Sequence, residues 1–349
     1  MDHNQPEDFL IIRLSSLGDI IHTLPAFAAL RRKFPNSRIT WLVEGKGKEI
    51  LDLVPGIDRI IVNRLKDFPL LSKHFRRAFQ TLRREIHDKE QTALDFQGLL
   101  KSGLFAALSG AQNRWGFPRK NLKEPSASVF YTRTPEPQPE QTHVIQKNLH
   151  LLTLADIHSN RFDFPLRIPS SVKENVNTKL TASGVSVREK LMICNVGAAW
   201  ETKRWHSAKW IPCIYQLQHT ENDLRILLLW GNESEKRLAE EISAQTGVSL
   251  VPFLNLQETF ALLERADLLL SGDTFALQAA CALGTPTVGL FGPTTPERNG
   301  PFSEADKIAI HSMDCSHCYR RTCTRLECMN GISSEEVAHL CHERRHHHA

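Results

Sequence analysis

Short apolar runs alternate along this sequence with longer segments whose apolar residues recur at helical spacing. The first run, 9–13, ends at a glycine-containing turn, 15–19, and apolar residues then follow every three or four positions. Further strands are expected at 38–43, 59–62, 92–96, 191–196, 225–230 and 287–291, and one strand is expected to end at 270. Helices are expected at 48–53, 99–108, 143–156, 207–219, 234–246 and 273–283. Strands that alternate with helices predict a parallel, doubly wound α/β sheet.

The alternation occurs twice, which predicts two α/β domains. A chain of 349 residues with 41% hydrophobic content is long enough for two domains of ordinary size. The proline-rich stretch 132–141 is expected to be a surface loop, because proline lacks an N–H donor, and 162–169 has the composition of a linker. We expect an N-terminal domain over 1–165, a second over 166–332, and a C-terminal helix or tail over 333–349 that could pack back on the first domain. The basic end, from 344, is expected to be disordered.

The charge balance excludes several classes of protein. Lys and Arg number 43 against 39 Asp and Glu, a net charge of +4 that is spread along the chain, so a nucleic-acid-binding arm is not expected. No apolar run reaches the roughly 18 to 20 residues that span a bilayer. Asp2, Glu7 and Asp8 do not fit a secretory signal. A soluble protein that stays inside the cell is expected.

Four of the eight cysteines are crowded into one short segment: Cys315, Cys318, Cys323 and Cys328. In a reducing compartment the scattered cysteines are expected to be thiols. A structural zinc site usually pairs two CxxC turns, and only one is present here. We therefore favour reduced surface thiols, and metal binding supplemented by His311 or His317 is the alternative.

Asp19 follows the first expected strand, at the place where a parallel sheet binds ligands. Ligands of open parallel sheets bind beyond the carboxyl ends of the strands. Asp19 is therefore either a reactive carboxylate or a helix N-cap, a position that Asp fills well. Gly18 suits both interpretations, because the turn favours a residue without a Cβ.

Three loops of the second half follow strands and carry residues that suit an anion. Lys203 and Arg204 either bind a phosphate or form a solvated pair. Asp273 and Thr274 open a helix whose first N–H groups attract anions, or they cap it. The third loop, 292–301, is rich in turn residues. The sequence has no complete dinucleotide fingerprint, Walker loop or Asp-x-Asp pair, so protein cations and amides would neutralise a bound diphosphate.

Five segments together resemble the ADP-heptose lipopolysaccharide heptosyltransferases of glycosyltransferase family 9: 11–25, 95–102, 203–205, 271–274 and 283–294. The resemblance runs from about residue 9 to about residue 337, and segment 15–25 is closer to the type I enzymes, which add the first heptose to Kdo, than to type II. It implies a GT-B fold of two facing Rossmann-like domains with parallel sheets. The first domain would bind the acceptor and the second the nucleotide sugar, with no metal and no cofactor in the reaction.

The resemblance also implies roles for individual residues. Asp19 would be the general base, and Ser16 and Lys101 would contact the acceptor. The donor would be bound by Lys203 at its diphosphate, Asp273 and Thr274 at phosphate and heptose, Glu235 at the ribose, Leu254 at the adenine, and Gln278. Relatives commonly have glycine and histidine where this chain has Phe275 and Gln278. Phenylalanine lacks the conformational freedom of glycine, and glutamine does not titrate.

The implied reaction is an inverting, metal-independent transfer of heptose from ADP-heptose to the inner core of lipopolysaccharide, with Kdo or heptose as acceptor, as in Kdo2-lipid A. The resemblance places such an enzyme in the cytoplasm, in peripheral contact with the inner face of the inner membrane. Basic segments 75–77 and 82–84 could supply that contact. The alternative is a non-catalytic or altered-donor GT-B protein that binds a glycan or nucleotide. A zinc-dependent nucleic-acid module rests on the cysteines alone and is disfavoured by the modest charge.

Overall fold

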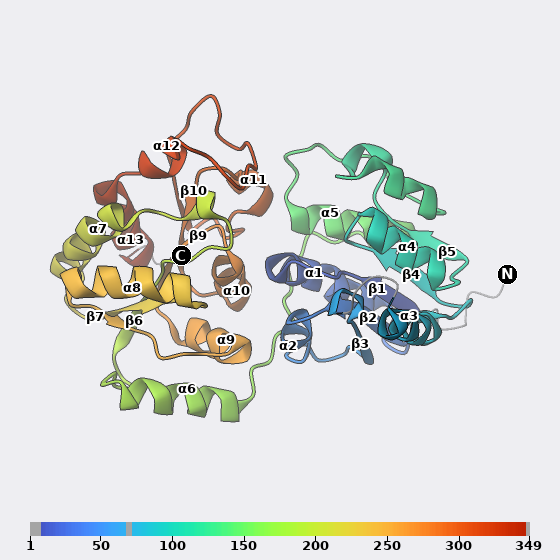
Figure 1. The fold of residues 1–349 in the computed structure, drawn as a ribbon, viewed down its shortest axis with the longest axis horizontal. Coiled ribbons are helices and arrows are strands. Elements are labelled where there is room, and N and C mark those ends of the chain that lie inside the picture. The colour runs from blue at the N-terminus through green and yellow to red at the C-terminus, as the bar shows by residue number, and fades with distance from the viewer. Residues whose placement is uncertain (1–7, 68–71, 347–349) are drawn as a thin grey trace. The chain divides into compact units, whose positions relative to one another are not determined.

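The structure, a computed structural model, describes residues 8–67 and 72–346. Asp2 and Glu7, which argued against a secretory signal, and the tail residues 347–349 lie outside this part. The chain divides into two compact units, Met1–Arg167 and Ile168–Ala349 (Figure 1). The division falls within the segment 162–169, whose composition predicted a linker. Within the described ranges, no helix has both the length and the apolar character that crossing a membrane requires.

The first unit is a five-stranded parallel sheet with the strand order β3-β2-β1-β4-β5. Its strands are β1 (Phe9–Ile12), β2 (Ile39–Glu44), β3 (Arg59–Asn63), β4 (Thr92–Asp95) and β5 (Asn113–Trp115). Its helices are α1 (Leu17–Lys33), α2 (Gly47–Leu51), α3 (Lys73–Ile86), α4 (Leu100–Leu108) and α5 (Val144–Leu151), with short 3₁₀ turns between them. This order reverses direction beside β1, as in Rossmann-like sheets.

Helices cover both faces of this sheet, which explains why its central strands are apolar throughout. All four residues of β1 are buried. Leu10 and Ile12 pack with Leu82 of α3 and Phe105 of α4 on one face. Successive side chains of a strand point to opposite faces, so the intervening residues of β1 face the other side of the sheet. A strand buried on both faces has no polar and apolar alternation.

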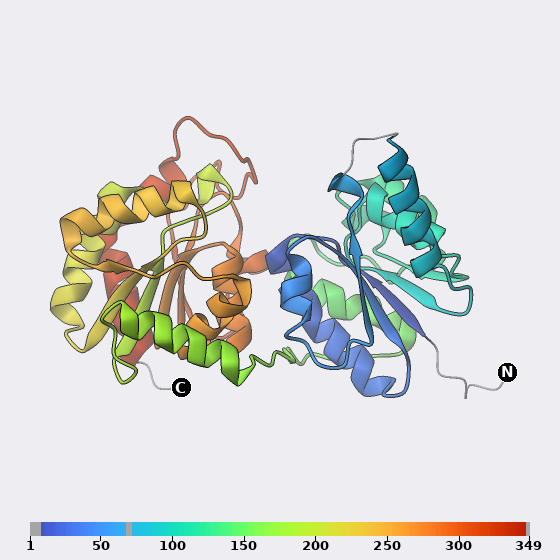
Figure 2. The same cartoon turned by 60° about the horizontal axis from the view of Figure 1, so that its bottom comes forward.

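The second unit is a six-stranded sheet with the order β11-β10-β9-β6-β7-β8, and all its pairings are parallel. Its strands are β6 (Lys190–Asn195), β7 (Leu224–Leu229), β8 (Ser249–Leu250), β9 (Leu268–Gly272), β10 (Thr287–Phe291) and β11 (Lys307–Ile310). Its helices are α6 (Ser170–Ala182), α7 (Ser207–Thr220), α8 (Glu233–Thr246), α9 (Leu256–Arg265), α10 (Phe275–Leu283), α11 (Pro296–Asn299), α12 (Glu327–Asn330) and α13 (Ser334–His346). Figure 2 shows helices on both faces of this sheet. Its order reverses beside β6, at the pair β6 and β9.

The last helix, α13, completes the core of the second unit. Val337, Ala338 and Cys341 are buried in the cluster that also contains residues of β6 and α7. Arg344 donates from Nε to Asp306 Oδ1 at 2.7 Å. The expectation of disorder from residue 344 was therefore wrong for 344–346, because buried carboxylates of the same unit bind this end of the helix.

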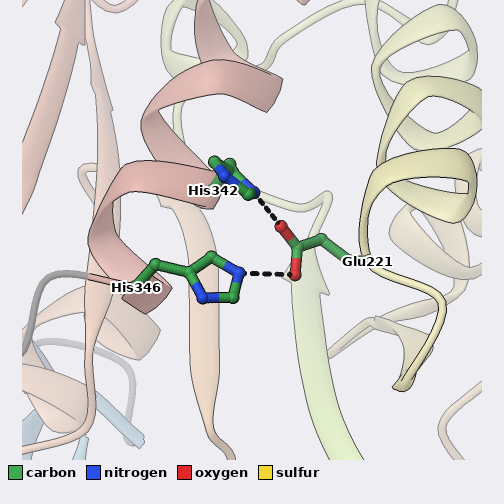
Figure 3. Close-up of side chains that lie close together, drawn as sticks. All are labelled: Glu221, His342 and His346. Atoms are coloured by element: carbon green, nitrogen blue, oxygen red, sulfur yellow. Dashed lines mark hydrogen bonds and ion pairs between the residues drawn. The ribbon is translucent and has the colours of Figure 1, made fainter.

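A cluster of charged side chains anchors α13 through Glu221, the residue that ends α7 (Figure 3). Its carboxylate is 2.6 Å from His342 Nδ1 and 3.4 Å from His346 Nε2. This is a set of three potential metal ligands within 4.8 Å of one another. Arg345, however, binds both Glu221 and Asp223. A guanidinium on the same carboxylate opposes a bound cation, so the cluster is an ion-pair network.

Replacing Glu221 should destabilise the second unit. Burial raises the pKa of Glu221, but His342 and Arg345 more than offset this and lower it. Glu221→Gln should reduce the free energy of unfolding by about 3 kcal/mol, the cost of breaking a buried ion pair from one side. The stabilisation is complete above the unfolded pKa of about 4.3 and is lost as the pH falls through the lower folded value.

Calorimetric unfolding of both proteins between neutral and acid pH measures this effect. Glu241→Gln, which changes an exposed glutamate of α8, is the matched control and should leave the unfolding temperature unchanged. A difference between Glu221→Gln and the wild type that stayed constant down to strongly acid pH would contradict the ionic explanation.

Candidate active site

In the first unit, charged and polar side chains gather at the carboxyl ends of β1, β2 and β4. β1 lies between the other two strands, so the loops that follow all three meet at one edge. Asp19 lies in the first turn of α1, just after β1. It is 36% exposed at its side chain. The predicted site residue is therefore accessible and lies at the edge where a doubly wound sheet binds ligands.

Three donors from two residues hold the Asp19 carboxylate. Arg13 Nη2 lies 2.8 Å from Oδ1. The backbone N–H and the hydroxyl of Ser16 donate to Oδ2 at 3.1 and 2.9 Å. An ionised carboxylate can accept about four hydrogen bonds. The Asp19 carboxylate can therefore accept one further hydrogen bond, for example from a ligand hydroxyl.

Asp19 is not the N-cap residue of α1, which was one of the two predictions for it. The N-cap is Ser16, and Asp19 is the third helical residue, whose side chain closes a capping box with Ser16. The carboxylate thus stabilises the start of α1 and is partly exposed at the same time. The structural and chemical interpretations of Asp19 are compatible.

The environment of Asp19 keeps it ionised. Burial raises its pKa, but the charges of Arg13 and His22 and the Ser16 hydrogen bonds outweigh burial and lower the pKa below its ordinary value. Arg13 is 7% exposed. It also donates from Nη1 to the Phe96 carbonyl oxygen. Arg13 therefore ties the start of α1 to the loop after β4.

A buried carboxylate, that of Asp95, organises that loop. Its Oδ1 accepts from the backbone N–H groups of Gln97 and Gly98 at 2.9 and 3.1 Å, and its Oδ2 from the Tyr131 hydroxyl at 2.7 Å. Burial raises the pKa of Asp95, and its hydrogen bonds offset only part of this. Gln97 Oε1 in turn accepts from the backbone N–H of Ser15 at 3.2 Å. Asp95 thereby positions the residues that precede Asp19.

The two predicted acceptor residues both lie at this edge. Ser16 is exposed and is bonded to Asp19. Lys101, in the first turn of α4, forms an ion pair with Glu44 at the end of β2. Its side chain is half exposed. Arg13 and Gln97 lie within the segments 11–25 and 95–102 but were given no role, because the hydrogen bonds that join these segments link residues 83 apart in sequence.

In the second unit, Lys203 and Asp273 form a nearly buried pair. Lys203 Nζ is 2.6 Å from Asp273 Oδ2 and 3.0 Å from its carbonyl oxygen. The ammonium also lies 4.5 Å from the centre of the Trp200 ring. An ammonium has three N–H donors, so one is left beyond the two that bind Asp273. Arg204 instead donates from Nε to the Ala198 carbonyl oxygen at 2.9 Å.

The first turn of α10 has no side-chain cap. Thr274 is the N-cap, but its hydroxyl makes no capping hydrogen bond. It is bonded instead to Asn195 Nδ2 at 3.0 Å and to the Ser271 hydroxyl at 3.0 Å. The first N–H groups of a helix attract anions when no side chain caps them. Thr274 is thus the N-cap residue but does not cap the helix through its hydroxyl, and Asn195 is a residue that the sequence analysis missed.

The two departures from the family pattern have local explanations. Phe275 begins α10 in an ordinary helical conformation, and its ring lies 5.5 Å from Phe260 of α9. The helix therefore starts here without the glycine of relatives. Gln278 is 3% exposed, and its Nε2 donates to the Asn299 carbonyl oxygen at 2.7 Å and lies 3.5 Å from Asp273 Oδ1. It links Asp273 to the third loop, 292–301.

The predicted ribose residue follows β7, and the predicted adenine residue follows β8. Glu235, in the first turn of α8, accepts from the Gly231 N–H at 2.8 Å. A Cβ on Gly197 would overlap its carboxyl group, so a side chain at 197 would require Glu235 to move. Leu254 is 8% exposed, whereas its neighbour Phe253 is 62% exposed. Trp230 lies 5.8 Å from Phe253. This exposed ring pair suits a planar base better than Leu254 alone.

The chain is similar in sequence to known proteins over most of its length. The profile of glycosyltransferase family 9 (heptosyltransferase) matches residues 75–329. The lipopolysaccharide heptosyltransferase 1 of Pseudomonas aeruginosa is 29% identical over 322 residues, 90% of this chain and 87% of the relative. That of Escherichia coli K12 is 26% identical over 310 residues, 86% of this chain and 92% of the relative.

Solved structures show the same fold. Escherichia coli heptosyltransferase WaaC with ADP-2-deoxy-2-fluoro heptose has a TM-score of 0.76 at 20% identity, covering 96% of this chain and 99% of that one. A family 9 glycosyltransferase from Veillonella parvula has a TM-score of 0.80 at 18% identity, covering 97% of each chain. These likenesses confirm the predicted GT-B class, with a parallel sheet in each unit.

The pair Lys203 and Asp273 predicts a stability effect. Lys203→Met leaves a carboxylate that is 7% exposed without its cation, so the second unit should lose about 3 kcal/mol of stability. Arg204→Met, which removes the neighbouring cation, should lower the free energy of unfolding by less than half of that amount. Chemical unfolding followed by tryptophan fluorescence measures both. Equal losses for the two variants would contradict the assignment of Lys203 as the partner of Asp273.

Proposed function

Because the chain belongs to glycosyltransferase family 9, we propose that it transfers heptose from ADP-heptose to the inner core of lipopolysaccharide, with Kdo or heptose as acceptor. The reaction would invert the anomeric centre without a metal. One observation carries this proposal: each unit places an organised charged group at the strand-order reversal of its sheet, a carboxylate in the first and a cation in the second.

The second unit supports donor binding. Lys203 and the uncapped first turn of α10 suit a diphosphate, because both present N–H donors and positive charge. As the bond between heptose and diphosphate breaks, they would stabilise the charge that grows on the leaving ADP, by roughly 3 kcal/mol for each well-placed donor. Glu235 is proposed at the ribose, and Leu254 with Phe253 at the adenine. Thr274 and Gln278 complete the donor-binding set.

The first unit supports the proton transfer. The acceptor hydroxyl oxygen would form a bond to the anomeric carbon while the bond from that carbon to the diphosphate oxygen breaks, and the hydroxyl proton would pass to Asp19. The lowered pKa makes Asp19 a weak base towards a hydroxyl. The proton would therefore move late, when the new C–O bond is largely formed. Ser16 and Lys101 are proposed to contact the acceptor.

A lipid-linked acceptor requires the enzyme to reach a membrane, and α3 offers a suitable surface. Phe75, Phe79, Leu82 and Ile86 lie on its packed side. Its exposed side carries five cations: Lys73, Arg76, Arg77, Arg83 and Arg84. Such a helix attracts anionic lipid headgroups. We propose that the enzyme acts in the cytoplasm, in peripheral contact with the inner membrane, through this face.

Asp19→Asn should abolish most transfer without loss of folding. Asparagine can still accept from the Ser16 N–H, so the cap is kept, but it cannot take up a proton. We expect kcat to fall by about 10² to 10⁴-fold, with unchanged affinity for ADP. The unfolding temperature should also fall, because Arg13, which is 7% exposed, loses its charged partner. In the wild type, kcat/KM should fall only below about pH 4, since the pKa of Asp19 lies below the usual value of about 3.9.

Asp52→Asn is the matched control, because Asp52 is also 36% exposed and paired with a cation, Lys48. It should leave kcat unchanged. Transfer is measured with ADP-heptose and heptose-free Kdo2-lipid A. A wild-type protein that binds ADP without transferring any sugar would instead favour the non-catalytic GT-B protein that Phe275 and Gln278 suggested. If Asp19→Asn is unfolded at the assay temperature, so that unfolding alone explains its loss of activity, only the capping role of Asp19 is left.

The α3 surface makes a separate prediction. Replacing Arg76 and Arg77 by glutamine should weaken binding to vesicles that contain anionic lipid by about thirtyfold, at about 1 kcal/mol for each charge. Sedimentation with vesicles at two salt concentrations measures it. Arg188 and Arg237, exposed cations of the second unit, are the matched control pair. Equal weakening by both double substitutions would contradict docking through α3.

A further inference from the structure

The pair of Lys203 and Asp273 cannot by itself neutralise a diphosphate. Its ammonium and carboxylate are 2.6 Å apart, so the pair carries no net charge. Each phosphate of a nucleoside diphosphate carries negative charge, and the first turn of α10 supplies the equivalent of only about half a positive charge. In the proposed metal-free reaction, further cations must therefore come from the protein, at the same edge of the second sheet.

Arg321 lies beside Lys203, because both side chains contact one indole ring. The guanidinium carbon of Arg321 is 5.0 Å from the centre of the Trp200 ring, and Lys203 Nζ is 4.5 Å from the same centre. Arg321 belongs to the loop between β11 and α12. The Arg320 carbonyl oxygen of this loop accepts from the Thr202 hydroxyl at 2.8 Å. The ring contact and the hydrogen bond together place a second cation at the proposed donor site.

A further arginine, Arg298, comes from the loop 292–301 that follows β10. Its guanidinium carbon lies 5.4 Å from the centre of the Tyr319 ring. The backbone N–H of Tyr319 donates to the Pro293 carbonyl oxygen at 2.9 Å, and that of Thr295 donates to the Tyr319 hydroxyl at 3.4 Å. Tyr319 has a left-handed backbone (φ 54°), a conformation that persists where surrounding structure holds it. Tyr319 therefore joins the two loops and orients Arg298.

Two links place Arg298 near Asp273. Gln278 Nε2 donates to the carbonyl oxygen of Asn299, the residue after Arg298, and is 3.5 Å from Asp273 Oδ1. Burial raises the pKa of Tyr319 above its ordinary value, and the charge of Asp273 adds to this, although a hydrogen bond with Arg298 acts in the opposite direction. The Tyr319 hydroxyl thus lies within electrostatic range of both charged groups.

Both arginines are exposed, and the protein itself does not neutralise them. Among residues 8–67 and 72–346, no carboxylate oxygen lies within 4.0 Å of either guanidinium. Arg13, Arg344 and Arg345, by contrast, each form an ion pair with a carboxylate. A cation held by an aromatic ring keeps its charge, and a guanidinium has five N–H donors. Most of these donors are therefore available to a ligand.

We propose that Arg298 and Arg321 bind the diphosphate of the donor and supply the charge that the pair of Lys203 and Asp273 lacks. A guanidinium can donate two parallel hydrogen bonds to a phosphate, so each arginine would contribute orientation as well as charge. During transfer both would stabilise the negative charge that grows on the leaving diphosphate. The inference rests on the proposed function, from which the nucleoside diphosphate at this edge is taken.

Calorimetric titration of the full chain with ADP tests the two arginines. Arg298→Gln and Arg321→Gln should each weaken ADP binding by about tenfold, the loss of one hydrogen bond to a charged group. Arg298→Lys and Arg321→Lys, which keep the charge, should weaken it less. Arg188→Gln and Arg325→Gln, which change exposed cations of the same unit, are the matched controls and should bind ADP as the wild type does.

Two further measurements separate phosphate binding from a structural effect. Added salt should weaken ADP binding more steeply in the wild type than in the glutamine variants, because salt screens the exposed charges. Adenosine, which has no phosphate, should bind the wild type and the variants equally. The unfolding temperature should change little in any variant, because all four arginines are exposed.

ADP affinity equal to that of the wild type in Arg298→Gln or in Arg321→Gln would overturn the role of that arginine. Equal losses for adenosine and ADP would overturn the assignment to the diphosphate. A wild-type protein that binds ADP, with both variants weakened, but transfers no heptose would contradict the proposed function and leave the two arginines at a nucleoside diphosphate site. Transfer of heptose with unweakened variants would overturn the inference alone.

Discussion

The reversal of strand order in each sheet determines where functional groups can collect. Next to β1 in the first unit, and next to β6 in the second, successive connections leave in opposite directions, so loops from neighbouring strands separate and leave an accessible edge. Backbone N–H groups and polar side chains that would be buried elsewhere are open to a ligand there. Asp19 and Lys203 both occupy this position, although no sequence repeat connects the two units.

The two sites use ion pairs in opposite ways. In the first unit the buried partner is the cation Arg13, and the accessible partner is the carboxylate of Asp19. In the second unit the buried partner is the carboxylate of Asp273, which holds the ammonium of Lys203. In each case the less exposed group orients the more exposed one, which fixes its position before any ligand arrives.

Sequence reasoning located the sheets and most strands, because buried parallel strands are apolar runs such as that of β1. It failed where stability comes from distant partners. The cationic helix α3 and the short edge strand β11 were not predicted, and α13 was expected only as a helix or tail. Asp19 and Lys203 were predicted from their places after strands and from the resemblance. Arg13 and Asn195 were not, since their importance depends on contacts that only the fold creates.

The close approach of Glu235 to Gly197 has a consequence for how this protein can diverge. The carboxyl group of one fills the volume that any side chain at the other would need. A larger residue at 197 would therefore displace the Glu235 side chain and break its hydrogen bond with the Gly231 N–H. A shorter side chain at 235 would remove that overlap, so the effects of substitutions at the two positions should not add.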